Sequence, residues 1–393
     1  MLTVIKFGGS SLSTAEKIYN AARIAAEHKK QGKDVVMVVS ARGKTTDALV
    51  REAEEISRTP DPRELDVLLS TGEQASMALV AMALIAMGVP AVSLCGWQAG
   101  ILTEDKHNRA KIISIHTERI RQELKSGRVV VAAGFQGMDS NGDITTIGRG
   151  GSDTSAVALA AALGAEECLI YTDVDGVYSA DPNVVQGAFR HTSLSCDEML
   201  EMASLGAGVL HNRSVELAKS KAVNLKVLSS SDSSGGTGIV PLPMEGSRVS
   251  GVMCDKNTAL VEMFSYGDGN LPEVLELLAA SSISADMIIS HGSRIGLTVP
   301  RSQVKAALKL LLDNGEKLSV TSACTDTNIA KLSIVGCGLC SDGSVASRML
   351  SALKNHGVQV RSMVCAEIKI SVLIPLSDAI DAVKCVHDVF FPQ

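Results

Sequence analysis

Short, almost purely apolar runs alternate with longer amphipathic runs through the first 230 residues of the chain. The segments LTVIKF (2–7) and DVVMVVS (34–40) are nearly continuous hydrophobic strands, as expected in a sheet that is buried on both faces. Between them, apolar positions recur at helical spacing, from a predicted capping box at Ser13 and Glu16 to a stop at Gly32. This order predicts one βαβ unit.

The same alternation continues and predicts an α/β domain with a mainly parallel central sheet flanked by helices. Further helices are expected around residues 64–87, 107–126, 152–164 and 195–222, and further strands around 90–94, 128–135, 168–173 and 223–228. After Leu228 the sequence becomes rich in Ser, Gly and Pro, which predicts a linker at 233–250 and ends the first domain at residue 232.

Two weakly similar halves follow the predicted linker. In each half a strand leads through a Gly-containing loop into a helix and then into a second strand. This repetition predicts an α+β regulatory domain over 251–393, built from two copies of a small module at about 251–325 and 326–393.

Composition narrows the classes of function. The chain has 393 residues, of which 46% are hydrophobic and 20% charged, and a formal net charge of −6, so no basic surface for nucleic acid or an anionic membrane is expected. No secretory leader and no uninterrupted apolar run of roughly 18 residues is evident, which favours a cytoplasmic location and small-molecule work. The nine scattered cysteines favour free thiols, and the lone pair Cys337 and Cys340 lacks the partners that a zinc site needs.

Two stretches of the chain have features of a phosphate-binding turn. The stretch VVSARGKTTD (38–47) looks like the end of a P-loop, but Val38 stands where the first glycine is required. The turn KFGGSSL is a better anion site, because Gly8 and Gly9 lie between a strand and a helix and Lys6 can reach the bound group. An ordinary strand-to-helix turn with a solvated lysine is the alternative.

Two further loops lie where a ligand crevice is expected. The turn TIGRGGSDTSA contains Arg149, which suits a carboxylate, and Asp153, which suits a lysine, a metal or free N–H groups at a helix start. Two glycine turns at the carboxyl ends of strands of one sheet predict a ligand crevice. The loop YTDVDGVYSADP lacks the glutamate and glycine of a calcium-binding EF-hand, and we interpret it as a nucleotide contact.

Six motifs, taken together and in this order, resemble those of the aspartate kinases (aspartokinases) of the amino acid kinase family. They are KFGGSS, VVSARGKTTD, LLSTGEQAS, TIGRGGSDTSA, YTDVDGVYSADP and EMLEMASLGAGVLHNRSVE. The second part, most clearly VRSMVCAEIKISVLI, is similar to the paired ACT modules of the same enzymes. The resemblance implies the amino acid kinase fold and a monofunctional enzyme. It also implies that ATP, with Mg²⁺, phosphorylates the β-carboxylate of L-aspartate, the first step towards lysine, threonine and methionine.

This chemistry agrees with the residue types. A β-carboxylate with a pKa of about 3.9 is ionised at neutral pH, so the nucleophile needs no general base. Catalysis then rests on positioning and on neutralising the charge of the transferring phosphoryl group, for which lysine, backbone N–H groups and Mg²⁺ are suited.

The resemblance implies a set of site residues. The ATP phosphates would contact Lys6, Gly8, Gly9 and Ser10, and the rest of the nucleotide would contact Thr172, Asp173, Tyr178 and Asp181. The aspartate pocket would contain Ser40, Thr46, Glu73, Arg149 and Ser152. Lys6, Arg149 and Asp153 would be catalytic, with Asp153 orienting Lys6. No resident metal site is expected.

The regulatory half has its own candidates. Asp268, Asn270 and Asp286 would contact a feedback amino acid, lysine or threonine, although Asp268 and Asn270 would also suit a simple turn. The resemblance further implies a homodimer or a larger oligomer that assembles through the ACT modules.

Three positions depart from the family pattern and keep other functions open. Gly208 stands where many members have a nucleotide-side lysine, Asn212 where many have proline, and Asn183 where many have arginine. Arg213 or Lys219 would be the substitute for the missing charge. The alternatives are a catalytically silent amino-acid-sensing paralogue and a kinase for another carboxylate such as glutamate.

Overall fold

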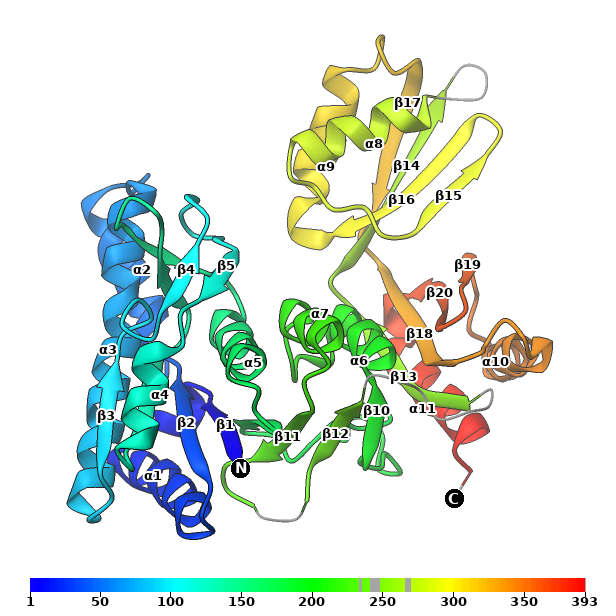
Figure 1. Cartoon of the computed structure of the whole chain (residues 1–393). Coiled ribbons are helices and arrows are strands. Elements are labelled where there is room, and N and C mark those ends of the chain that lie inside the picture. Colours follow the sequence, from blue (N-terminus) through cyan, green and yellow to red (C-terminus); the bar gives the residue numbers. More distant parts are fainter. Residues whose placement is uncertain (233–234, 241–247, 266–269, 393) are drawn as a thin grey trace. The chain divides into compact units, whose positions relative to one another are not determined.

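The computed structural model describes residues 1–232, 235–240, 248–265 and 270–392 (Figure 1). The chain divides into two compact units. The first is Met1–Val177 with Arg190–Met244, and the second is Tyr178–Phe189 with Glu245–Gln393. Residues 178–189 therefore belong to the second unit, although they lie within the range predicted to be the catalytic domain. We call this segment the excursion at 178–189.

The first unit is built on an eight-stranded sheet. Its strands are β1 (Leu2–Phe7), β2 (Asp34–Val39), β3 (Ala91–Leu94), β6 (Val129–Ala133), β9 (Glu167–Thr172), β10 (Ser193–Ser195), β11 (Leu225–Ser229) and β12 (Thr237–Val240), in the order β10-β12-β11-β9-β1-β2-β6-β3. All neighbours pair in parallel except β11 and β12. The predicted α/β fold is confirmed. Strand β12 lies inside the predicted linker and extends this sheet beyond residue 232.

Alternation along β1 brings Lys6 to the site. Ile5 and Phe7 are fully buried in a core shared with helices α1 (Ala15–Lys30) and α3 (Pro62–Ala86). Successive side chains of a strand point to opposite faces, so Lys6 projects from the other face, where helix α5 (Gly151–Leu163) packs on β1, β2 and β9.

Two helices that pack on the large sheet need comment: α1 for its first residue, and α3 for its apolar length. The N-cap of α1 is Thr14, whose hydroxyl accepts the Lys17 N–H, and not the predicted Ser13. Helix α3 is the one described helix that is long and apolar enough, by length and composition alone, to cross a membrane. It packs against α1, β3 and β6, so its apolar residues contribute to the core of this unit.

A second, four-stranded sheet in the first unit was not predicted. Strands β4 (Ile101–Thr103), β5 (Ile112–Ile115), β7 (Gln136–Met138) and β8 (Ile144–Thr146) form it in the order β5-β4-β7-β8. The helix predicted over 107–126 is wrong in its first half, because Ile-rich β5 precedes the short helix α4 (Glu118–Lys125). Helix α2 (Thr45–Ile56) was also not predicted.

The predicted helix at 195–222 is two helices. They are α6 (Cys196–Met202) and α7 (Asn212–Lys221). A π-helical turn at Ala203–Ala207 and the positive φ of Gly206 and Gly208 separate them. The break is explained by these two glycines, because both adopt a backbone conformation that other residues rarely adopt.

The second unit has two four-stranded sheets, each covered by two helices. One contains β14 (Thr258–Ser265), β15 (Ile288–His291), β16 (Arg294–Pro300) and β17 (Val320–Asp326), with α8 (Leu271–Ala280) and α9 (Val304–Asp313). The other contains β13 (Arg248–Asp255), β18 (Ile329–Cys337), β19 (Ser362–Cys365) and β20 (Lys369–Pro375), with α10 (Gly343–Asn355) and α11 (Ala379–Phe390).

The two modules had been predicted to follow one another along the chain. In the structure they are interleaved instead. Strand β13, assigned to the first module by the predicted boundary at 251, pairs antiparallel with β18 in the second. The excursion at 178–189 joins the same second module, since Ala180 and Val185 lie in its core. The whole first module is thus inserted after the first strand of the second.

Candidate active site

One pocket of about 1220 Å³ in the first unit collects most of the predicted site residues. Those that line it are Lys6, Gly9, Ser40, Thr46, Glu73, Arg149, Ser152 and Asp153. They come from the carboxyl ends of the parallel neighbours β1 and β2, from α2 and α3, and from the turn that opens α5. The pocket therefore lies at the edge of the sheet where ligands of α/β proteins usually bind.

Lys6 and Asp153 form an ion pair in this pocket. Lys6 Nζ lies 2.5 Å from Asp153 Oδ1, and the two side chains are only 10% and 13% exposed. Asp153 sits in the first turn of α5, after an N-cap glycine in the left-handed conformation. The carboxylate thus fixes the ammonium of the lysine at a helix N-terminus, an arrangement that suits an anionic group.

The two glycines of KFGGSS have different roles in the turn. The Gly8 N–H is already donated to the Tyr171 carbonyl at 3.1 Å. Within the described residues no acceptor is recorded for the N–H groups of Gly9 and Ser10. A Cβ on Gly9 would lie 2.5 Å from the Ala41 carbonyl oxygen, so only glycine fits there. The turn can therefore present two free N–H groups to an anion, and Gly8 is not one of the donors.

The loop SARGKTTD packs directly on this glycine turn. The Gly43 N–H donates to the Gly9 carbonyl at 2.9 Å, and the Ser40 N–H donates to the Phe7 carbonyl at 3.2 Å. This contact places Ser40 and Thr46 on the pocket wall. It also places Lys44, an exposed residue of the same loop, on the pocket wall.

Glu73 is a buried carboxylate with one oxygen left free. It is 3% exposed, and its Oε1 accepts the Ala41 N–H at 2.9 Å. Its Oε2 has no partner among the described residues. Burial raises the pKa of Glu73 to about 7, although the hydrogen bond from Ala41 opposes this rise. A buried acceptor that faces a pocket without a partner is expected to bind a ligand cation.

The second glycine turn presents Arg149 to the same pocket. Arg149 is exposed, and no ion pair holds it within the described residues. Gly150 has φ +67°, and a Cβ there would lie 2.2 Å from His211 Cβ and Cγ. The imidazole of His211 thus packs on the backbone of the turn, and a free guanidinium beside it is suited to a carboxylate.

The candidate substitutes for the missing family lysine are already engaged. Lys219 pairs with Asp197 at 2.5 Å. Arg213 lines the main pocket, but its guanidinium donates to the carbonyls of Ile147 and Ala110. Gly208 itself lines a neighbouring pocket of about 420 Å³ together with Asp153 and His211. The departure from the family pattern thus falls beside the Lys6–Asp153 pair.

The four residues predicted to contact the rest of the nucleotide are divided between the two units. Thr172 and Asp173 follow β9 in the first unit, outside the lining of the main pocket, and the Thr172 hydroxyl donates to Asp173 Oδ1. Tyr178 and Asp181 belong to the second unit. There Asp181 Oδ1 accepts the backbone and side-chain N–H groups of Asn183, which explains this residue as a turn former. Their contacts with a nucleotide stay predictions.

The predicted effector residues lie in the first ACT-like module or beyond what is described. Asp268 lies outside the described residues. Asn270 is the N-cap of α8, and its side chain donates to the Lys317 carbonyl at 3.3 Å rather than to the helix. Asp286 pairs with the buried Lys331, which comes from β18 of the second module. Asp286 is therefore already bound to a cation of the protein.

Sequence reasoning missed the residues of the small sheet that reach the pocket. The loop between β4 and β5 contributes Glu104, Lys106, Asn108, Arg109 and Lys111, and Thr146 of β8 also lines the pocket. Part of this loop fell within the helix predicted over 107–126, and none of its residues was named as a candidate. The row of Ile residues in β5 was the one available signal of a strand.

Comparisons with known proteins agree with this geometry. The family model of the amino acid kinases matches residues 1–229, and an ACT domain model matches residues 332–390. Aspartokinases of a Bacillus species and of Pseudomonas aeruginosa are 44% and 45% identical to the chain, each over 99% of it and 97% of the relative. Escherichia coli aspartokinase III with aspartate and ADP (R-state) superposes with a TM-score of 0.84 at 26% identity over 100% of both chains. The same enzyme with lysine and aspartate (T-state) gives a TM-score of 0.82 at 26% identity over 99% of both.

Proposed function

The chain belongs to the amino acid kinase family and, within it, to the aspartokinases, and from that premise we propose how its pocket phosphorylates L-aspartate with ATP. The observation that carries the proposal is one pocket that holds the Lys6–Asp153 pair together with a Glu73 oxygen and an Arg149 guanidinium for which the described part of the chain offers no partner. These groups match a small zwitterion with an ammonium and two carboxylates next to a triphosphate.

L-Aspartate binds between α3 and the second glycine turn. Its ammonium meets Glu73 Oε2, and its α-carboxylate meets the Arg149 guanidinium, which is planar and suited to a bidentate contact. The hydroxyls of Ser40, Thr46 and Ser152 line the same space and complete the recognition of the substrate. The β-carboxylate is then directed towards Lys6.

ATP binds with its phosphates at the first glycine turn. Gly9 and Ser10 donate their N–H groups, Gly8 allows the close approach, and Lys6 contacts the γ-phosphoryl group. We place Thr172, Asp173, Tyr178 and Asp181 along the rest of the nucleotide, as the resemblance implies. Among the described residues no cluster of three or more His, Cys, Asp or Glu side chains could hold a metal. Mg²⁺ bound with ATP would supply positive charge next to the phosphates that face Lys6.

The transfer itself needs no proton movement. A β-carboxylate oxygen forms a bond to the γ-phosphorus while the bond from that phosphorus to the oxygen bridging to the β-phosphorus breaks. The products are 4-phospho-L-aspartate and ADP. Lys6, held at 2.5 Å by Asp153, lies beside the moving charge and stabilises the transition state.

Regulation and assembly follow from the second unit. We propose feedback inhibition by lysine, threonine or both through the first ACT module, with Asp268, Asn270 and Asp286 as contacts, and a homodimer or larger oligomer through these modules. The T-state of E. coli aspartokinase III with lysine and aspartate supports this proposal. We also propose a cytoplasmic location.

A coupled ADP-release assay tests the function. The purified full chain is given Mg·ATP with L-aspartate, with L-glutamate or with no acceptor, and hydroxylamine traps the acyl phosphate. Turnover with aspartate alone is expected, and chelation of Mg²⁺ abolishes it. No aspartate-dependent turnover would favour the silent, amino-acid-sensing paralogue that Gly208 suggests. Equal turnover with glutamate would refute the substrate.

A further inference from the structure

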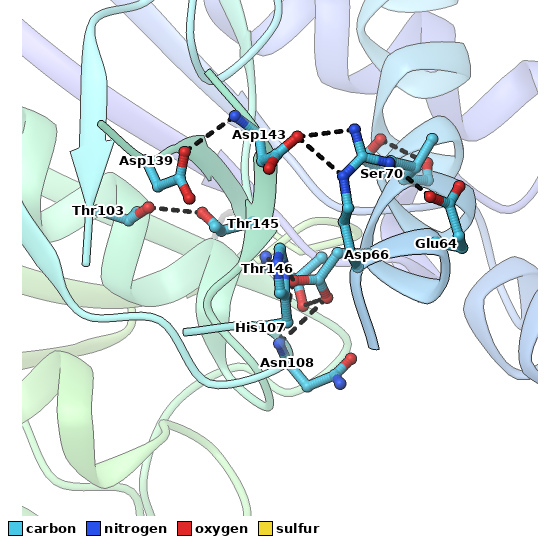
Figure 2. A network of polar contacts seen from close by, with 12 residues as sticks. Glu64, Asp66, Ser70, Thr103, His107, Asn108, Asp139, Asp143, Thr145 and Thr146 are labelled. Atoms are coloured by element: carbon cyan, nitrogen blue, oxygen red, sulfur yellow. Dashed lines mark hydrogen bonds and ion pairs between the residues drawn. The ribbon is translucent and has the colours of Figure 1, made fainter. Parts of the chain in front are cut away.

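Asp66 is a fully buried carboxylate that the proposed mechanism does not use, and it is hydrogen-bonded to Asn108 and Thr146, which line the pocket. It is 0% exposed and lies in the first half of α3. Figure 2 shows its two oxygens facing Asn108, His107 and Thr146. An unpaired carboxylate in such a place would strongly destabilise the fold, so these contacts need an explanation.

The donors to Asp66 come from two segments that are far from it in sequence. The Thr146 hydroxyl donates to Oδ1 at 2.5 Å, and the Thr146 N–H donates to Oδ2 at 3.0 Å. The Asn108 N–H also lies 3.0 Å from Oδ2, and His107 Nδ1 lies at the same distance, which favours the tautomer with a proton on Nδ1. One side chain therefore joins α3 to strand β8 and to the loop between β4 and β5.

Each of these three segments carries a part of the aspartate site. Asp66 and Glu73 are seven residues apart on α3, which is two helical turns, so they lie on the same side of the helix. Thr146 is the last residue of β8 and stands three residues before Arg149. Asn108 and Thr146 also line the pocket themselves. Asp66 thus links the helix that carries Glu73 to the strand that leads to Arg149. These are the residues proposed to bind the ammonium and the α-carboxylate of aspartate.

The backbone of the loop is strained in a way that Asp66 compensates. Asn108 has φ +65°, a left-handed conformation that is uncommon for residues other than glycine. Its N–H is held by Asp66, and its carbonyl lies so close to Gly148 that a Cβ there would be 2.8 Å away. From the other side, Arg213 donates to the carbonyls of Ala110 and Ile147. The loop and the second glycine turn are therefore clamped together at both ends.

We propose that Asp66 is a positioning residue for aspartate: it holds α3, the loop at 107–108 and β8 so that Glu73 and Arg149 are spaced for the substrate. The inference rests on the proposed function. It implies that loss of Asp66 weakens aspartate binding selectively, because the glycine turn at Gly8 and Gly9 does not contact this network in the described structure.

The test compares Asp66→Ala and Asp66→Asn with the unchanged full chain. The asparagine can keep one oxygen on the two backbone N–H groups and on His107 Nδ1, and donate its amide to the Thr146 hydroxyl, so it is expected to rescue most of the binding. The matched control is Thr145→Val. Thr145 precedes Thr146 in β8, and this change removes its buried 2.6 Å hydroxyl contact with Thr103 of β4 without touching Asp66 (Figure 2). The measurements are the KM values for aspartate and for Mg·ATP, the fraction of active enzyme, and the melting temperature.

For Asp66→Ala we expect the aspartate KM to rise by about ten- to a hundredfold, as for outer residues that orient a binding group, while the Mg·ATP KM changes less than about twofold. A lower melting temperature with unchanged KM values, or an equal rise for both substrates, would overturn the proposal. If Asp66→Ala does not fold, Thr146→Val is measured instead, and an unchanged aspartate KM there would equally overturn it. Failure of the unchanged chain to turn over aspartate would instead refute the proposed function.

Discussion

Replacing Glu73 by glutamine should stabilise the ligand-free protein above about pH 7 and at the same time weaken its binding of aspartate. The pKa of Glu73 rises from 4.5 to about 7 because the side chain is buried. The carboxylate is therefore less stable in the folded than in the unfolded chain. At about 1.4 kcal/mol for each pH unit between the two pKa values, the ionised group costs about 3 kcal/mol of folding free energy.

The sign of the pH dependence follows from the raised pKa. Below about pH 4.5 the carboxyl is protonated in both states and carries no penalty. The penalty grows as the pH rises through the interval up to about 7 and is constant above it. Glutamine keeps an acceptor for the Ala41 N–H but leaves its own amide unpaired, which costs about 1 to 2 kcal/mol. Glu73→Gln should thus gain about 1 to 2 kcal/mol at pH 8, but gain nothing at pH 5, where the remaining penalty of about 1 kcal/mol does not exceed the cost of the unpaired amide.

The assay combines melting temperatures with aspartate kinetics. For a domain of this size the gain corresponds to roughly 2 to 6 °C at pH 8. Removing the buried partner of the substrate ammonium should cost at least about 2 kcal/mol, or roughly a thirtyfold rise in the aspartate KM. Glu54→Gln, on the exposed side of α2, is the control for a change of charge alone. A stability difference that does not vary between pH 5 and 8 would refute the desolvation argument, and an unchanged aspartate KM would refute the ammonium contact.

Three further predictions concern the same pocket. The aspartate KM of the unchanged chain should rise by up to tenfold per pH unit as the pH falls below about 7, since protonated Glu73 cannot pair with the ammonium, and a flat profile down to pH 6 would contradict this. Lys6→Ala should lower kcat by about a hundredfold or more with a smaller effect on the KM for Mg·ATP, so a raised KM alone would show that Lys6 does not act on the transferring group. Gly150→Ala should lower kcat/KM for aspartate by at least about tenfold, because its Cβ would meet His211 at 2.2 Å. Gly127→Ala, at φ +79° with open space around it, is the matched control and should change only stability.

The parts of the fold that could be predicted are those with a long, unambiguous pattern. Strands β1 and β2 are apolar runs of six residues, and α1 has a full amphipathic period, so their order alone indicated a parallel sheet. Strands of three or four residues, such as β4 and β8, carry too few positions for a period to appear. Strand β13 reads like any other strand, and only long-range pairing with β18 reveals its module.

Site residues could be predicted where they lie in a recognisable motif of glycines and charged residues. A single polar residue outside such a motif could not be predicted. Lys6, Glu73 and Asp153 were identified through the motifs that resemble the family, and the pocket brings them together. Asp66 gave no comparable signal, because an aspartate in the first turns of a helix ordinarily faces water or caps the N-terminus. Its only sequence clue is its spacing of seven residues from Glu73, on a stretch where the neighbouring positions are apolar.

Local charge explains why the family lysine missing at Gly208 need not end activity. The chain as a whole carries a net charge of −6, yet eight Lys and Arg residues line the main pocket against four Asp and Glu. Within the described residues, Lys44 and Arg109 have no recorded ion pair, so both are available to the anionic substrates. Charges inside a pocket with low-dielectric walls act strongly at short range, so this local excess of cations favours anionic ligands despite the negative net charge. Because this positive excess comes from loops that only the fold brings together, neither the net charge nor a single motif could reveal it.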